Sequence, residues 1–145
     1  MENRHAEVKA YLRRLKGISD DINVIKAQME NLRLSMLPQG VSYDKDPVQT
    51  SPQDPMANFA VKLDELGREL AERQKEYETV FDEISAVICA VKNGDARVIL
   101  AKRYIGFKCW QDIESEVPYC VRVLHRKHNI GLMEIEKMLG IEKVI

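Results

Sequence analysis

The sequence has little of what builds a disulfide-rich, membrane-spanning or polybasic protein. Its 145 residues include only three cysteines, and none forms a CxxC pair, so we expect no disulfide framework and a reducing cytoplasm. No apolar run approaches the roughly 18 residues of a membrane span, and the N-terminal stretch has no apolar core of a signal peptide. The formal net charge is −1, so any attraction to phosphate must come from a local patch.

Aromatic residues make up only 6% of the chain, and it holds 7 glycines and 5 prolines. Because hydrophobic residues reach 45% and charged residues 31%, the composition favours a helical globular or coiled-coil protein. The sequence contains no glycine-rich phosphate loop, no nucleophile beside a base and no pair of inward carboxylates. We therefore expect an all-α protein that is not an enzyme.

Two long heptad seams occupy the first two thirds of the chain. Apolar residues recur every three or four positions from Val8 to Met36, and again from Met56 to Val91 with Arg73 as the one charged member. Such a repeat predicts helices that pack along their length. Residues 37–55 contain four prolines, and their apolar residues follow neither the helical nor the strand spacing, which indicates a long loop. We predict that residues 1–93 form an antiparallel coiled-coil helical hairpin with a Pro-rich loop 37–55. Either it forms a homodimer, which we favour, or the C-terminal helices cover it.

A second domain is predicted over residues 94–145. Asn93-Gly94 breaks the helical pattern, and Asp95 is the expected N-cap of a helix over 95–105. Gly106 is expected to end that helix in the left-handed conformation. A short helix over 110–116, a corner at Pro118-Tyr119 and a longer helix over about 120–139 complete a helix-turn-helix.

The last predicted helix has an apolar face and a basic face. Steps of 100° place Leu124, His128, Ile135 and Leu139 on one side, and Arg122, Arg126 and Asn129 on the other. Residues 97–129 hold seven basic and three acidic side chains, a net of +4 in a chain whose total is −1. The positive charge is therefore concentrated where a helix that enters a DNA groove needs it.

The run RYIGFKCWQDIESEVPYCVRVLHRKH resembles region 4 of sigma-70-type factors, and most closely the version in small phage and prophage proteins that include ArpU-type late transcriptional regulators. The loop LPQGVSYDKDPVQTSPQDPM extends the resemblance to most of the chain. The matching positions are Arg103-Tyr104-Ile105, Gly106, Trp110-Gln111-Asp112-Ile113, Tyr119, Arg122, Arg126 and His128. The resemblance implies a phage-derived regulator in a bacterial cytoplasm that contacts host RNA polymerase. Four residues depart from the pattern: Cys109 and Cys120 at the helix starts, Pro118 in the turn and Lys127 at a usually apolar position.

The expected partner is double-stranded DNA, with the helix over 120–139 in the major groove. The residues expected to contact DNA are Arg122, Val123, His125, Arg126, Lys127 and Lys108. Arginine is the commonest partner of guanine O6 and N7, although an exposed basic face is the simpler interpretation. Lys108 is nearly as well explained as a surface lysine. We expect no cofactor or metal, because Cys109, Cys120, His125 and His128 match no familiar zinc spacing, and His128 is expected to be packed.

The function we favour is sequence-specific DNA binding by a transcriptional regulator. The alternative from another class is a helical assembly or scaffold protein, such as a small-terminase-like packaging component, whose working surface is the hairpin. A third option is a protein that binds polymerase or another regulator without binding DNA.

Overall fold

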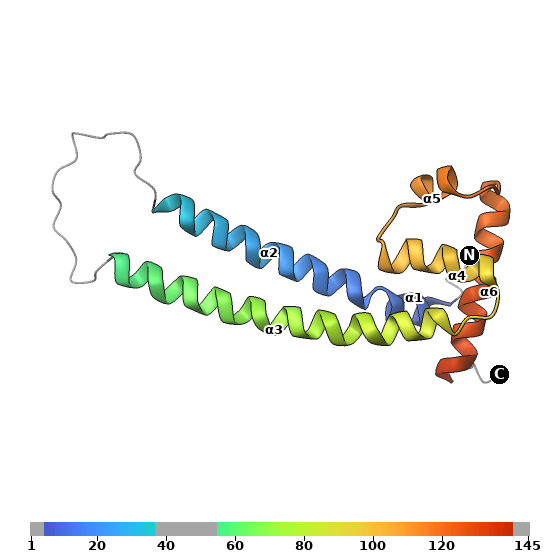
Figure 1. Cartoon of the computed structure of the whole chain (residues 1–145), viewed down its shortest axis with the longest axis horizontal. Helices are drawn as coiled ribbons and strands as arrows, with labels where there is room; N and C mark the ends of the chain where they lie inside the picture. The colour runs from blue at the N-terminus through green and yellow to red at the C-terminus, as the bar shows by residue number, and fades with distance from the viewer. Residues whose placement is uncertain (1–4, 37–54, 141–145) are drawn as a thin grey trace. The chain divides into compact units, whose positions relative to one another are not determined.

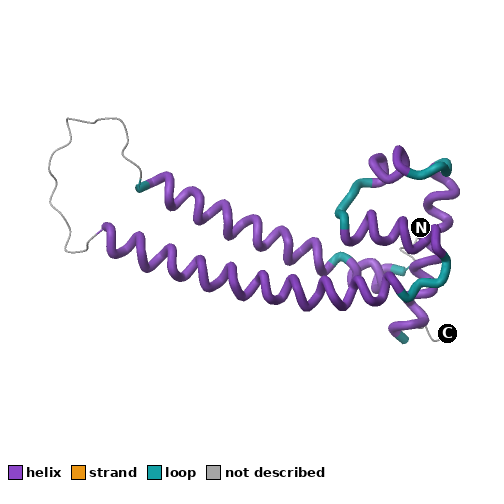
Figure 2. Tube along the Cα trace, viewed as in Figure 1, coloured by secondary structure: helices purple, strands orange, loops and turns teal. Residues whose placement is uncertain are grey.

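The computed structural model describes residues 5–36 and 55–140, in which every regular element is helical (Figures 1 and 2). The all-α prediction is therefore confirmed. The elements are α1 (Ala6–Leu12), α2 (Arg14–Ser35), α3 (Pro55–Cys89), α4 (Gly94–Leu100), a π-helical turn η1 (Ala101–Ile105), α5 (Trp110–Glu116) and α6 (Val121–Leu139). The predicted Pro-rich loop lies outside the described residues except for Pro55, the first residue of α3. Within the described ranges, no helix combines the length and apolarity that a membrane crossing requires.

The chain divides into two compact units, which differ from the expected domains. Unit 1 comprises residues 1–19 and 76–145, and unit 2 comprises residues 20–75. The expected boundary after residue 93 thus lies inside unit 1. The reason is that α1 and the end of α3 belong to the same compact unit as the C-terminal helices: α1 contacts α6, and Leu12 and Ile84 are both fully buried.

The core of unit 1 holds α4, α5 and α6 together. Ile99, Ile113 and Leu124 are fully buried and form one cluster, with Trp110, Val117 and Tyr119 packed around it. Burying one such aliphatic side chain contributes about 2 kcal/mol. These contacts fix α6 against the elements that precede it in sequence.

The start of α4 is capped by Asn93 rather than by Asp95, so the predicted N-cap was wrong by two residues. The Asn93 side-chain oxygen accepts a hydrogen bond from the Ala96 backbone N–H at 3.0 Å. Glu134 of α6 accepts a further bond from the Lys92 backbone N–H at 2.8 Å. Donors that the start of a helix leaves without intrahelical partners are satisfied in this way, which ties this end of α4 to α6.

The predicted helix over 95–105 changes character at its midpoint. After Leu100 it widens into η1, and the Gly106 N–H donates to the Ala101 carbonyl at 2.9 Å. Gly106 has φ −85°, while Phe107 has φ 56°. The left-handed residue is therefore Phe107, which corrects the prediction for Gly106. Gly106 serves close approach instead, because a Cβ there would lie 3.0 Å from the Lys102 carbonyl oxygen.

The predicted first helix is divided at Arg13, where α1 ends and α2 begins. Gly17 does not interrupt α2. In unit 1, α1 and α2 are fastened to α3 by Glu83, whose Oε2 accepts hydrogen bonds from the Tyr11 hydroxyl at 2.7 Å and from Arg14 Nη2 at 2.9 Å. These hydrogen bonds fix the entry of the chain to the end of α3.

Unit 2 contains the remainder of α2 and α3, which lie side by side (Figure 1). Residues of both helices, including Leu32 and Leu66, line a shared groove. Most seam residues there are half-buried, and among the described residues of unit 2 only Ile25, 4% exposed, is a buried apolar side chain. Four large apolar side chains of this unit are exposed: Val24, Leu34, Met56 and Val61.

Candidate nucleic-acid interface

Two helices joined by a short turn form the candidate interface, close to the predicted bounds. They are α5 and α6, separated by residues 117–120. Cys109 and Cys120 occupy the two N-cap positions, and neither thiol makes a side-chain cap hydrogen bond. A thiol is a poor cap, so the core cluster rather than capping holds the helix starts in place.

Helix α6 presents two chemically distinct faces. Leu124, His128, Leu132 and Ile135 are buried on the side toward the core. Arg122 and Arg126 are exposed on the opposite side, one helical turn apart, with exposed Asn129 beyond them. Both carboxylates of α6 contact other segments: Glu134 accepts from the Lys92 N–H, and Glu136 lies 3.3 Å from the His5 ring. The outer face near its N-terminal half is therefore basic.

Lys127 is half-buried and paired rather than fully exposed. Its Nζ lies 2.9 Å from Asp95 Oδ2 and 5.2 Å from the centre of the Tyr119 ring. Hydrogen bonds from Tyr119 and Lys127 lower the pKa of Asp95. An ion pair and a cation–π contact thus hold the Lys127 ammonium group.

Lys108 is also paired inside unit 1. Its Nζ lies 2.6 Å from Glu116 Oε2, and Lys102 Nζ lies 2.6 Å from the other oxygen of the same carboxylate. Hydrogen bonds from Lys102 and Lys108 lower the pKa of Glu116 to about 2. Two lysines therefore neutralise the carboxylate at the end of α5. Without that carboxylate, both lysines would add to the positive charge of unit 1.

A buried polar and aromatic cluster supports α6 from inside. His128 Nε2 lies 2.9 Å from the Tyr104 hydroxyl, and Trp110 meets His128 edge-on at 4.7 Å between ring centres. Burial lowers the pKa of His128 to about 3, so the ring is neutral at pH 7, and the prediction of a packed histidine is confirmed. His125 is half-buried with its ring 4.5 Å from Trp110, and Val123 is half-buried as well.

The net charge of +4 for residues 97–129 overstates the positive charge that is available to contact DNA. Four of the seven basic side chains there have internal partners: Lys102 and Lys108 with Glu116, Lys127 with Asp95, and Arg103 with the Lys108 carbonyl and the Trp110 ring. In the part of the chain that the structure describes, the side chains of Arg97, Arg122 and Arg126 have no hydrogen-bond or ion-pair partner. Of the six residues predicted to contact DNA, Arg122 and Arg126 are the two that are exposed and free.

Sequence reasoning missed the residues that join distant segments. Glu134 lies 42 positions from Lys92, and no sequence signal points to that contact. Asn93 had a usable signal, since asparagine is a preferred N-cap.

No family model, curated protein or solved structure matches this chain.

Proposed function

We propose that the protein is a sequence-specific DNA-binding regulator of phage or prophage origin, in which α5 and α6 form a sigma region 4-like helix-turn-helix. Helix α6 lies in the major groove, and Arg122 and Arg126 contact base edges. The resemblance of residues 103–128 to phage regulators motivates the biological assignment. It also extends the proposal to a contact with host RNA polymerase in the bacterial cytoplasm.

The observation that carries the proposal is the pair of free arginines on a supported helix. The side chains of Arg122 and Arg126 are exposed and lack partners among the described residues. The opposite face of α6 is buried against the core, which holds the helix in place. The 19 residues of α6 span about 28 Å, and a helix fits a major groove about 12 Å wide. Two arginines one turn apart can each form paired hydrogen bonds to a guanine.

The other predicted contacts take secondary roles in this proposal. Lys108 and Lys127 would share their ammonium groups between their present carboxylates and DNA phosphate. Val123 is half-buried beside the basic face and could touch a thymine methyl group only at close approach. His125 already packs on Trp110, so its contribution is to hold the helix in place.

The proposed partner of unit 2 is a second copy of the chain, joined through the predicted coiled-coil hairpin. Its seam is half-buried, and Val24, Leu34, Met56 and Val61 are exposed. A helical pair with this exposure gains stability when another helical pair covers it. In a dimer, the separation of the two α6 helices would set the spacing of DNA half-sites.

The same exposed side chains support a second candidate function, a helical assembly or scaffold component of the small-terminase kind. The two functions differ in the number of subunits. A dimer in native mass spectrometry fits the regulator, whereas a ring of many subunits fits the assembly protein. A chain that binds no DNA at low salt would point instead to the third option, a protein that binds other proteins alone.

Selection from random-sequence duplex DNA tests the proposal. Purified protein should enrich a defined motif, and binding of the enriched duplex should weaken steeply with salt because phosphate contacts release counterions. Arg126→Ala should reduce affinity for that duplex by at least about tenfold while leaving the unfolding midpoint unchanged. Arg33→Ala, which removes an exposed arginine of unit 2, is the matched control and should bind normally. Equal affinities of the wild type and Arg126→Ala would refute the proposal.

A further inference from the structure

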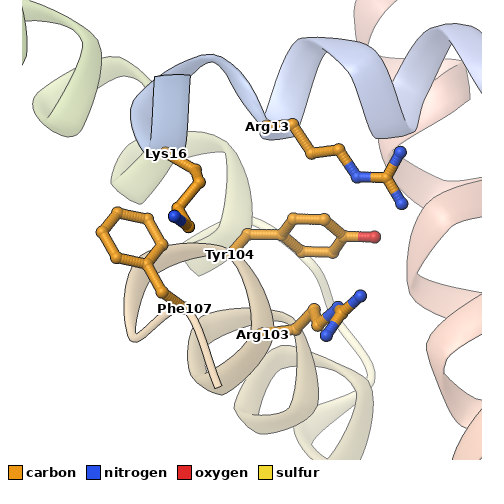
Figure 3. Close-up of a pocket in the computed structure, with 5 residues that line it drawn as sticks. All are labelled: Arg13, Lys16, Arg103, Tyr104 and Phe107. Carbon is orange, nitrogen blue, oxygen red and sulfur yellow. The ribbon is translucent and has the colours of Figure 1, made fainter. Parts of the chain in front are cut away.

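A pocket of about 180 Å³ lies within unit 1, away from the outer face of α6. It is lined by Arg13, Lys16, Arg103, Tyr104 and Phe107. Figure 3 shows the Tyr104 ring between Arg13, from the α1–α2 junction, and Arg103, from η1, with the Lys16 side chain next to the Phe107 ring. All five residues belong to the same compact unit.

Three cationic side chains line this small space. Arg13 and Lys16 approach from the N-terminal helices and Arg103 from η1, and none of the lining residues is acidic. The charges of Arg13 and Arg103 act on the Tyr104 hydroxyl and oppose the rise in its pKa that burial causes. An anion in this pocket would be attracted by the positive charges that line it.

The same pocket is lined by two aromatic side chains. Tyr104 is buried and its hydroxyl is already bonded to His128, so that hydroxyl is not the group that would bind a ligand. Phe107 forms the other wall, with Lys16 Nζ 5.9 Å from its ring centre. Phe107 holds φ 56°, a conformation that costs a bulky residue free energy and that recurs at functional sites. The neighbouring Gly106 would adopt it at no such cost, yet the chain places the phenyl ring there.

We propose that this pocket binds a small planar organic anion: a single aromatic or heterocyclic ring that carries a carboxylate or a phosphate. The ring would lie against Tyr104 and Phe107, and the anionic group would be held by Arg13, Lys16 and Arg103. A cavity of about 150 Å³ holds one benzene ring, so the volume here fits one ring with its substituent. The site bridges the α1–α2 junction and η1.

Four small probes test the chemistry: phenyl phosphate, benzoate, inorganic phosphate and benzyl alcohol. The first two combine a ring with an anion, and the others carry one feature each. Trp110 is the only tryptophan, and the Arg103 guanidinium lies 4.6 Å from the centre of its ring. Movement of Arg103 toward a bound anion should therefore change tryptophan fluorescence, which gives a binding signal that does not depend on DNA.

Phenyl phosphate or benzoate should bind saturably at millimolar or lower concentration, and at least fivefold more tightly than inorganic phosphate or benzyl alcohol. Binding of only one ring-bearing probe would identify the anionic group that the site accepts. Arg13→Gln should weaken binding at least fivefold, whereas Arg33→Gln, an exposed arginine of α2 outside the pocket, should not. Lys16→Gln provides a second pocket variant if Arg13→Gln lowers the unfolding midpoint.

Three results would overturn the proposal: no saturable binding of either ring-bearing anion, inorganic phosphate binding as tightly as phenyl phosphate, or equal effects of Arg13→Gln and Arg33→Gln. A protein with both Arg122→Ala and Arg126→Ala should still bind the probe. That variant separates this site from the DNA proposal, since either can fail while the other stands.

Discussion

The two units of the chain use helices in different ways. Among the described residues, sixteen of the seventeen buried apolar side chains belong to unit 1, and Ile25 alone belongs to unit 2. Unit 1 also holds the buried Tyr104–His128 pair and the paired lysines around Glu116. Unit 2 presents a half-buried seam and exposed apolar side chains.

This difference in burial indicates which unit should be stable by itself and which should associate with a second copy. A helix pair with one seam buries too little to be stable alone, because conformational entropy opposes its ordering. Unit 1 has a core that closes on itself, so it should fold without help. We therefore expect unit 2 to be the part whose order depends on a second copy.

The largest expected effect is on the free energy of unfolding of unit 1. Leu124→Ala deletes a fully buried side chain from the central cluster and should cost about 3 kcal/mol. Leu66→Ala truncates a half-buried side chain of unit 2 and should cost about 1 kcal/mol, because less apolar surface is lost. Urea unfolding followed by circular dichroism measures both values. Equal losses of unfolding free energy in the two variants would contradict the proposed difference between the units.

The next effect is a pH dependence that belongs to unit 1, since unit 2 contains no histidine. The His128 pKa of about 3 lies below the ordinary value of about 6.5. Between these values the unfolded chain binds the additional proton, so stability falls as pH drops. The loss from pH 7 to pH 5 should be about 2 kcal/mol. The lowered carboxylate pKa values, such as that of Glu116, act only at lower pH.

Urea unfolding at pH 7 and pH 5 measures this dependence in three proteins. The wild type and His125→Gln should both lose stability at pH 5. His128→Gln removes the buried titratable ring and should lose much less. A His128→Gln protein with the full wild-type loss would show that other groups cause it.

A concentration dependence should distinguish unit 2. Amide hydrogens of residues 20–36 and 55–75 should exchange faster than those of α6 in dilute protein, because fewer buried contacts protect them. Their protection should increase severalfold on raising the protein concentration, since association stabilises the associated form. Hydrogen exchange read by mass spectrometry measures both regions in one sample. Protection in unit 2 that is already equal to that of α6 at the lowest concentration, and unchanged on concentration, would contradict the contrast.

The smallest expected effect concerns the paired lysines of unit 1. Glu116→Gln removes the carboxylate that Lys102 and Lys108 share, which frees positive charge near the proposed interface. DNA affinity at low salt should increase a few-fold, and the salt dependence should steepen by about one counterion for each lysine that reaches a phosphate. Glu72→Gln, an exposed change in unit 2, is the matched control. An unchanged slope would exclude these lysines from the interface.

Local patterns were enough to predict several features. The bounds of α5 and α6 followed from the apolar spacing around Trp110 and Leu124 and from the turn at Pro118. The burial of His128 followed from its place on the apolar face of α6. These features depend on periodicity and turn chemistry, which a short stretch of sequence contains.

The features that sequence could not supply depend on contacts between distant residues. Lys127 meets Asp95, which lies 32 positions earlier, and Arg13 shares a pocket with Arg103. The widening at η1 and the left-handed Phe107 result from how the end of that helix packs, and the neighbouring glycine pointed to the wrong residue. The predicted homodimer and the predicted contacts with DNA and RNA polymerase stay predictions.

The most direct test of the central claim is methylation protection of guanine N7 on a duplex enriched by selection, because N7 lies in the major groove. The wild type should protect one or two guanines, and Arg126→Ala or Arg122→Ala should each lose protection at a different guanine while Arg33→Ala loses none. Guanines that stay equally reactive with and without saturating wild-type protein would contradict the placement of α6 in the major groove.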